Sequence, residues 1–338
     1  MGRIIVTGGC GYIGSHTVTL LLDQGHEVLI IDDLSNARQD VVHAIGKITG
    51  IVPQFEQVDL SSSEKTKACF IKHQNYDAII HFAASKAVGE SKEKPLEYYK
   101  NNLNTLINTV QEGSANGVKN LIFSSSASVY GEVTKTPIEE DDLRHQPVSP
   151  YGNTKKIGEE ILSDFTFIKK DFNAISLRYF NPIGAHPTAL IGESPTGIPN
   201  NLLPYITQTA SGALPELNVF GDDYPTKDGT AIRDYIHVMD LAEAHVKALN
   251  RLLEFKNTRR HEVFNIGSQK GYSVMEVIHA FEKCNKLKLN YKIKSRRAGD
   301  IAVLVASTSK AKNDLNWEAS FSLEDMVTSA WNWEKSRK

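Results

Sequence analysis

Short runs of apolar, mostly β-branched residues alternate with amphipathic stretches through the first half of the chain. The apolar runs lie at Arg3–Thr7, Glu27–Asp32, Asp77–Phe82 and Asn120–Ser124. Apolar residues follow one another in these runs instead of alternating with polar ones, which is typical of parallel strands covered on both faces of a sheet. The pattern therefore predicts four buried parallel strands.

Helical periodicity fills the intervals between these runs. It extends over Ile13–Gln24, Ser63–His73, Leu96–Asn116 and Tyr151–Phe165. Glycines follow the first and third of these stretches, where a helix commonly ends. Strand and helix in repeated alternation predict an α/β fold built on a doubly wound parallel Rossmann-type sheet.

The pattern changes after Asn181. Residues 182–199 contain four prolines and three glycines, which excludes long regular elements there. We therefore predict a first domain over residues 1–181 and a smaller mixed α/β domain over residues 182–338. Within the second part, residues 235–265 again favour a strand followed by a helix, and we expect this segment to pack back onto the first domain.

Composition narrows the class of protein. The 338 residues are 41% hydrophobic and 23% charged, with a formal net charge of −2. This balance argues against disorder and against a general nucleic-acid binder, which needs a basic excess. No apolar run reaches membrane-spanning length. The three cysteines are far apart and the 11 histidines are dispersed, so we expect a cytoplasmic protein with no metal site and no membrane contact.

A glycine-rich segment joins the first predicted strand to the first predicted helix. Gly8, Gly11 and Gly14 form the pattern GxxGxxG, a variant of the dinucleotide fingerprint in which backbone amides and the helix N-terminus receive a pyrophosphate. Asp32 ends the second strand, where a carboxylate accepts hydrogen bonds from the adenosine ribose and repels a 2′-phosphate. The pair predicts NAD(H) in preference to NADP(H), with Arg38 the only nearby feature that points the other way.

A second constellation lies near residue 150. Tyr151 and Lys155 are four residues apart and share one helix face. A nearby ammonium group, and the positive charge of an oxidised nicotinamide, favour the phenolate and lower the tyrosine pKa, which makes it a base for a sugar or alcohol hydroxyl. A tyrosine and a lysine four residues apart are expected by chance in a chain of this composition, so this pair alone does not indicate a site. Ser126 follows a buried strand at the sheet edge where such folds bind ligands, and its hydroxyl can bridge the substrate oxygen and the phenol.

Taken together, these residues resemble the extended short-chain dehydrogenase/reductase superfamily and, within it, the UDP-glucose 4-epimerase (UDP-galactose 4-epimerase) family. The resemblance extends nearly from end to end. Its most specific segments are Lys86–Ser91, Gly197–Leu202, Asp222–His237 and the Arg-Ala-Gly-Asp sequence of residues 297–300. It implies Tyr151 as the catalytic base, Lys155 as its electrostatic partner and Ser126 as the proton bridge.

The resemblance also implies ligand-binding residues. Those implied for NAD, besides the three glycines and the three catalytic residues, are Tyr12, Ile13, Asp32, Asp33, Leu34, Ser35, Asn36, Ala37, Asp59, Leu60, Phe82, Ala83, Ala84, Ser85, Lys86, Asn101 and Phe180. Those implied for a UDP-sugar, besides Tyr151, are Lys86, Ser126, Ala127, Ser128, Asn181, Asn201, Leu202, Val219, Phe220, Arg233, Arg297, Asp300 and Leu304. Arginines suit forked recognition of a diphosphate, and a carboxylate suits ribose hydroxyls.

The implied activity is interconversion of UDP-galactose and UDP-glucose in galactose metabolism, by transient oxidation at sugar C4. The resemblance also implies a homodimer formed through residues 96–116 and 151–165. Narrow-pocket relatives have tyrosine where Leu304 stands, which predicts a roomier pocket that admits UDP-N-acetylhexosamines. Two alternatives stay open: a nucleotide-sugar 4,6-dehydratase, which would need an Asp-Glu pair in the serine segment, and a non-catalytic NAD-binding sensor.

Overall fold

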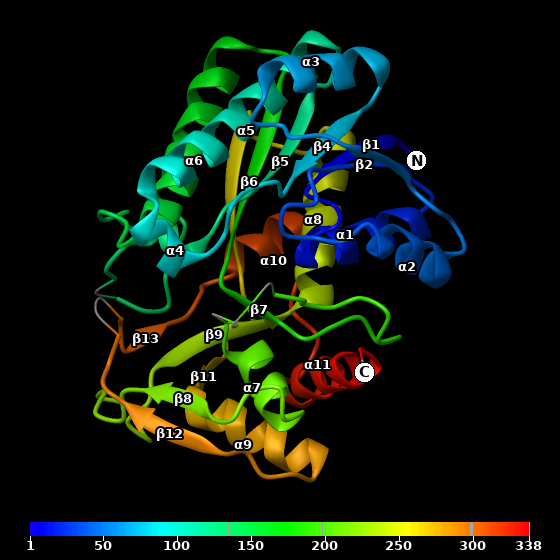
Figure 1. Ribbon diagram of the computed structural model, residues 1–338. Coiled ribbons are helices and arrows are strands. Elements are labelled where there is room, and N and C mark those ends of the chain that lie inside the picture. Colours follow the sequence, from blue (N-terminus) through cyan, green and yellow to red (C-terminus); the bar gives the residue numbers. More distant parts are fainter. Residues whose placement is uncertain (134, 196, 198, 200, 298–299, 338) are drawn as a thin grey trace.

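The computed structural model describes residues 1–133, 135–195, 197, 199, 201–297 and 300–337. Two lobes are visible in Figure 1, a larger one that contains both the N-terminal segment and the central sheet and a smaller one that contains the C-terminal helix. In the larger lobe, seven parallel strands pair in the order β10-β6-β5-β4-β1-β2-β3. The predicted doubly wound parallel sheet is thereby confirmed. The strand order reverses between β1 and β4, the position at which open α/β sheets form a ligand crevice.

The elements of the larger lobe follow one another as strand and helix. Its strands are β1 (Arg3–Thr7), β2 (Glu27–Asp32), β3 (Gln54–Gln57), β4 (Ala78–His81), β5 (Asn120–Ser124), β6 (Asn173–Tyr179) and β10 (His261–Ile266). Its helices are α1 (Tyr12–Asp23), α2 (Asp40–Thr49), α3 (Ser63–Lys72), α4 (Val88–Glu93), α5 (Pro95–Ala115), the 3₁₀ turn η1 (Ala127–Tyr130), α6 (Pro150–Ile168), α8 (Val238–Leu253) and α10 (Ser309–Leu315).

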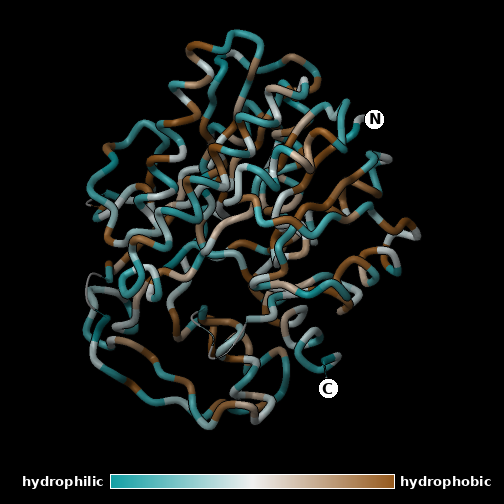
Figure 2. The backbone as a smooth tube through the Cα atoms, turned by 45° about the horizontal axis from the view of Figure 1, so that its top comes forward, coloured by the Kyte–Doolittle hydropathy of each residue, from teal (hydrophilic) through white to brown (hydrophobic). Residues whose placement is uncertain are grey.

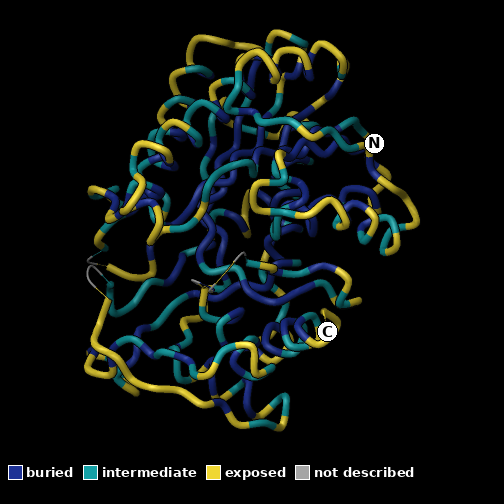
Figure 3. The backbone as a smooth tube through the Cα atoms, in the orientation of Figure 1, coloured by how far each residue is buried: buried dark blue, intermediate teal, exposed yellow. Residues whose placement is uncertain are grey.

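Two hydrophobic layers cover this sheet. On one face, Ile4, Val6 and Ile80 pack with side chains of α1, α2, α8 and α10. On the other face, Ile5 and Ile79 pack with α3, α5 and α6. The central strands are accordingly brown in Figure 2 and dark blue in Figure 3. Burial on both faces explains why apolar residues run continuously along them.

The smaller lobe has its own core, formed by Leu203, Ile206, Tyr235, Phe281 and further apolar side chains. Its elements are β7 (Asn181–Ile183), α7 (Leu202–Ala210), β8 (Leu217–Phe220), β9 (Ile232–His237), β11 (Gly271–Ser273), α9 (Val274–Asn285), β12 (Tyr291–Lys294), β13 (Val303–Leu304) and α11 (Leu323–Ser336). β9 pairs with β7, β11 and β13, and β12 pairs with β8. None of the described helices is long and apolar enough to cross a membrane.

The chain crosses between the lobes more than once. After the smaller lobe has begun, α8 packs against α1, and β10 adds the seventh strand to the sheet beside β6. Sequence periodicity did not predict α2, β3, α4 or β6. β3 escapes notice because its residues Gln54–Gln57 are polar except for Phe55, as befits a strand at the edge of the sheet.

Candidate functional site

A cavity of about 2050 Å³ lies where the two lobes meet. Its first wall comes from the carboxyl ends of β1, β2 and β4 with the segments that follow them, and its second wall comes from the smaller lobe. We call these the sheet wall and the lobe wall. The cavity thus occupies the crevice expected at the reversal of strand order.

The glycine segment of the sheet wall can fold this tightly against neighbouring backbone only because side chains are missing there. A Cβ atom on Gly8, whose φ is +70°, would lie 2.7 Å from the Ala83 amide nitrogen, and one on Gly14 would lie 2.3 Å from the Gly8 carbonyl oxygen. Gly11 caps α1 without a side-chain hydrogen bond, so the first amides of the helix stay available to an anion. This arrangement fits the pyrophosphate of a dinucleotide.

Asp32 stands at the end of β2 beside this segment. Its carboxylate is buried and accepts hydrogen bonds from the backbone amides of Cys10 (3.0 Å) and Leu34 (2.9 Å). Burial raises the pKa of Asp32, and the two amides oppose that rise. Arg38, the feature that favoured a 2′-phosphate, is exposed and pairs with Asp40 at 2.9 Å. The wall therefore offers a ribose-binding carboxylate and an arginine that is already neutralised.

Nearly all residues predicted to bind the cofactor line the cavity. Asn101 donates to the Ser85 hydroxyl (3.1 Å), and Asp59 accepts from the Ser61 amide and hydroxyl. Residues of this group on the cavity surface are Gly8, Gly11, Tyr12, Ile13, Gly14, Asp32, Asp33, Leu34, Ser35, Asn36, Ala37, Asp59, Leu60, Phe82, Ala83, Ala84, Ser85, Lys86, Asn101, Tyr151 and Lys155.

Tyr151 and Lys155 reach the cavity from the first turns of α6. The Lys155 ammonium donates to the Ser124 carbonyl oxygen (2.6 Å) and lies 5.9 Å from the centre of the Tyr151 ring. Burial lowers the pKa of Lys155 to about 7. Burial also raises the pKa of Tyr151 to about 12, opposed by a hydrogen bond with Ser126. In the protein alone, burial therefore outweighs the lowering of the tyrosine pKa that we expected from the lysine.

The lobe wall presents charged and amide side chains. Arg233 lies on β9 and forms an ion pair with Asp300, while the guanidinium of Arg297 stacks over the Phe220 ring at 4.2 Å. Both arginines line the cavity, and the residues predicted for a UDP-sugar that join them there are Lys86, Tyr151, Asn181, Asn201, Leu202, Phe220 and Asp300. Ala298 and Gly299, which complete the motif of residues 297–300, lie outside the described residues.

Some predicted residues are not on the cavity surface. Val219 is 1% exposed and packs into the core of the smaller lobe. Its side chain points away from the cavity, because alternate residues of β8 face opposite sides and Asn218 and Phe220 take the cavity side. Val219 as a UDP-sugar residue stays a prediction. Phe180, Ala127 and Leu304 pack together in a small apolar cluster beside the cavity. Ser126 and Ser128 hydrogen-bond each other behind the lining residues.

Sequence reasoning missed Glu193. Its carboxylate accepts from Lys86 of the sheet wall (3.0 Å) and from Asn201 of the lobe wall (2.7 Å), so it links the two walls. It lies in the segment rich in proline and glycine, where no periodicity marks a buried residue. Asn218 and Tyr179 also line the cavity. The alternation along β8 was the signal that could have revealed Asn218.

Comparison with known proteins places this geometry among characterised relatives. The chain is 47% identical to a UDP-glucose 4-epimerase of Erwinia amylovora, over 98% of this chain and 97% of that protein. It is 49% identical to a UDP-glucose 4-epimerase of Schizosaccharomyces pombe, over 99% of this chain and 94% of that one.

Solved structures agree with the sequence relatives. A UDP-glucose 4-epimerase of Stenotrophomonas maltophila, with bound NAD and formylated UDP-arabinopyranose, superimposes with a TM-score of 0.95 at 46% identity, covering 100% of this chain and 99% of that one. The Bifidobacterium longum enzyme in complex with NAD⁺ and UDP gives 0.94 at 42% identity, covering 99% and 98%. Residues 4–267 match the NAD dependent epimerase/dehydratase family, and the chain belongs to this family.

Proposed function

We propose that the protein interconverts UDP-galactose and UDP-glucose by transient oxidation and reduction at sugar C4. The observation that carries this proposal is the convergence of three features on one cavity: the glycine segment with Asp32, the pair Tyr151 and Lys155, and the arginine-bearing lobe wall. The curated relatives, each named UDP-glucose 4-epimerase, support the same activity.

The residues divide the work between binding and proton transfer. NAD, held along the glycine segment with a ribose on Asp32, supplies the hydride acceptor and donor that reversible oxidation of C4 requires. Tyr151 takes the proton of the 4-hydroxyl and later returns it, with the Ser126 hydroxyl as the bridge. Lys155 keeps positive charge beside the developing phenolate.

The lobe wall determines what the sugar can do. Arg233 and Arg297 hold the diphosphate, and Asp300 accepts from ribose hydroxyls. Binding energy then falls mainly on UDP, so the 4-keto sugar is free to turn and presents its other face before it is reduced. This division explains how one cavity can invert a carbon centre without a second active site.

The two alternatives are less well supported. A 4,6-dehydratase needs an acid and a base near C5 and C6, and the serine segment has Ser126, Ala127 and Ser128 where an Asp-Glu pair would stand. A sensor would have no use for a buried tyrosine and lysine beside the cofactor wall. The curated relatives favour the epimerase.

We also propose a cytoplasmic homodimer. Leu96 and Ile107 on α5 are exposed and lie about three helical turns apart, and Phe167 and Ile168 are exposed at the end of α6. Exposed apolar side chains on these two helices suit a helical interface between two copies. Cys10, Cys69 and Cys284 are free thiols, as expected in a reducing compartment.

One experiment tests the function directly. The purified protein is incubated with UDP-galactose and no added NAD, and the products are separated by chromatography. UDP-glucose should form, and acid extraction should release NAD(H) from the protein. A 4-keto-6-deoxy product would indicate the dehydratase instead, and an absence of any product would contradict the proposal.

A further inference from the structure

Helix α6 presents three polar residues on the face that it buries against the sheet. Tyr151, Lys155 and Glu159 follow one another at intervals of four residues, and all three are buried. This spacing places them in one row along the helix. Tyr151 and Lys155 have roles in the proposed reaction, whereas Glu159 lies one turn further from the cavity and is not among the residues that line it.

Three consecutive serines at the end of β5 bind this row. Each serine contacts one residue of the row. The order of the serines along the chain differs from the order of their partners along the helix. The pairs are Ser126 with the Tyr151 hydroxyl, the Ser124 carbonyl oxygen with Lys155 Nζ (2.6 Å), and Ser125 Oγ with Glu159 Oε1 (2.6 Å). Glu159 is thus bound to the residue that lies between the two serines that contact the catalytic pair.

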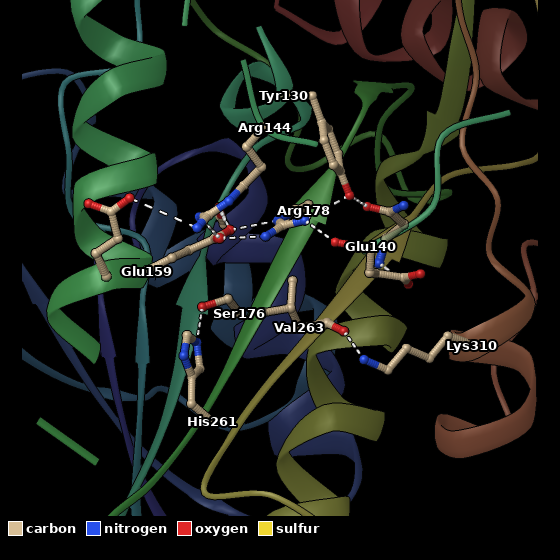
Figure 4. Close-up of polar contacts among 12 residues, drawn as sticks. Tyr130, Glu140, Arg144, Glu159, Ser176, Arg178, His261, Val263 and Lys310 are labelled. Atoms are coloured by element: carbon tan, nitrogen blue, oxygen red, sulfur yellow. Dashed lines mark hydrogen bonds and ion pairs between the residues drawn. The ribbon is translucent and has the colours of Figure 1, made fainter. Parts of the chain in front are cut away.

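Arg178 of β6 fixes Glu159 from the opposite side. Its Nε donates to Glu159 Oε1 (2.9 Å) and its Nη2 donates to Oε2 (2.7 Å), with both side chains at most 4% exposed. Arg144 Nη1 adds a third guanidinium donor, to Glu159 Oε2 at 3.0 Å. Figure 4 shows Glu159 reaching from α6 toward both guanidinium groups, with Tyr130 beyond Arg178. Although burial opposes ionisation, these partners hold the pKa of Glu159 below its ordinary value, so the pair is charged.

Two glycines bring α6 close to β5 and to the turn η1 that follows the serines. A Cβ on Gly152 would lie 2.9 Å from the Ser128 carbonyl oxygen, and one on Gly158 would lie 2.7 Å from the Phe123 ring. This close approach puts the buried row within hydrogen-bonding reach of the serine segment. The polar contacts between them are directional and resist a turn of the helix about its own axis.

We propose that Glu159 is a positioning residue: through its two-point ion pair with Arg178 and its hydrogen bond to Ser125, it sets the rotation of α6 and the path of the serine segment, and thereby the placement of Tyr151, Lys155 and Ser126. Buried ion pairs contribute little net stability compared with apolar residues of similar size. A bidentate carboxylate–guanidinium pair is, however, strongly directional. Directionality is the property that the catalytic row requires.

Loss of this positioning should raise the pKa of the catalytic base. A turn of the helix would weaken the contact of Ser126 with Tyr151, and this contact is the one that lowers the tyrosine pKa against the effect of burial. The pKa of the base would then rise, and the rising limb of the kcat–pH profile would move to higher pH. Substrate affinity, which depends on the lobe wall, would stay unchanged.

The test compares two buried ion pairs of the same kind. In the first variant, Glu159→Leu with Arg178→Met replaces the proposed positioning pair by apolar residues. The control, Glu262→Leu with Arg251→Met, removes the two-point pair between α8 and β10 (2.7 and 3.0 Å), which does not contact the serine segment. Full-length holoenzyme is assayed with UDP-galactose at several pH values, well below the melting temperature of each variant.

We expect the first variant to lose at least tenfold in kcat at neutral pH, with its rising limb shifted upward and KM within twofold of the starting protein. The control should keep kcat, KM and the pH profile. Equal kcat and equal pH profiles in the two variants would overturn the proposal, as would a loss confined to KM.

A smaller change keeps the test valid if the double variant does not fold. Ser125→Ala removes one hydrogen bond and leaves the ion pair, and Ser176→Ala is its control, since Ser176 is also buried and hydrogen-bonds His261 (2.8 Å). Ser125→Ala should lower kcat several-fold and shift the pH profile, and Ser176→Ala should do neither. An unchanged profile for Ser125→Ala would overturn the proposal.

This inference rests on the proposed epimerase function, and the two can fail separately. Absence of turnover in the unmodified protein would contradict the function. Turnover in the unmodified protein, with no difference between the Glu159 variant and its control, would contradict the positioning role alone.

Discussion

The glycine segment of the sheet wall is made of backbone and small residues, whereas the lobe wall presents the long side chains of Arg233 and Arg297. Gly8 and Gly14 lie so close to neighbouring backbone that no Cβ fits. Arg297, in contrast, is exposed and is held mainly by the Phe220 ring. Closely packed backbone suits a ligand that stays bound through every turnover, and exposed side chains suit one that must be exchanged.

The largest effect should come from the group that stands between the two walls. Tyr151→Phe removes the phenol oxygen and leaves the ring, so the fold and both binding sites should persist. A general base contributes about 10²–10⁴-fold, and we expect kcat to fall by that factor. Single-turnover measurements of UDP-glucose formation, with bound NAD(H) quantified in parallel, test this. Retention of more than a tenth of the activity would refute Tyr151 as the base.

The next largest effect should be a loss of bound NAD(H) when the sheet wall, and not the lobe wall, is changed. Gly14→Ala places a Cβ against the Gly8 carbonyl oxygen, so the glycine segment must shift and the pyrophosphate cradle is lost. We expect the purified variant to carry only a small fraction of the starting NAD(H). Gly89→Ala is the control, because nothing lies within 4 Å of its added Cβ. Full NAD(H) content in Gly14→Ala would mean that the backbone approach is not what holds the cofactor.

A change in the lobe wall should weaken substrate binding and leave the NAD(H) content unchanged. Arg297→Ala removes a charged donor from the cavity without touching the glycine segment. A hydrogen bond to a charged group contributes about 1.5–3 kcal/mol, which corresponds to a rise of roughly 10- to 100-fold in KM for UDP-galactose. NAD(H) content should be unchanged. A fall in kcat with constant KM would show that the two walls are not specialised as described.

The smallest effect concerns the apolar cluster beside the cavity. Leu304 packs with this cluster and pairs in register with Arg233. If a smaller residue here makes the pocket roomier, the unmodified protein should turn over UDP-N-acetylgalactosamine. Leu304→Tyr should then slow that reaction several-fold more than it slows turnover of UDP-galactose. No detectable reaction of the N-acetyl sugar with the unmodified protein would end the hypothesis of a broad pocket.

How far the sequence predicts the site depends on how each residue is held. The glycine segment and Asp32 were predictable because local spacing determines their geometry. The side of β8 that faces the cavity could not be predicted, because the packing of this short strand against β12 and the core of the smaller lobe decides whether Val219 or Asn218 lies on that side. Glu193 could not be predicted, since its partners Lys86 and Asn201 are joined only by the fold.

The pKa values of the site residues also depend on long-range contacts that the sequence does not reveal. The pair Tyr151 and Lys155 was predictable from its spacing along one helix face, but the burial that raises the Tyr151 pKa was not. Burial depends on the close approach of β5 and α6 at Gly152 and Gly158. Long-range packing of this kind leaves no periodic signal in the chain.

The late return of the chain to the sheet has a consequence for synthesis. β10 pairs with β6 only after β7, α7, β8 and β9 of the smaller lobe, and helix α8, have been made. On a ribosome that adds roughly 5–20 residues per second, the nascent sheet waits for seconds with the edge of β6 unpaired. An unpaired strand edge is open to pairing with another chain. The same connection that ties the lobes together therefore makes the unfinished protein dependent on protection of that edge until residue 266 has emerged.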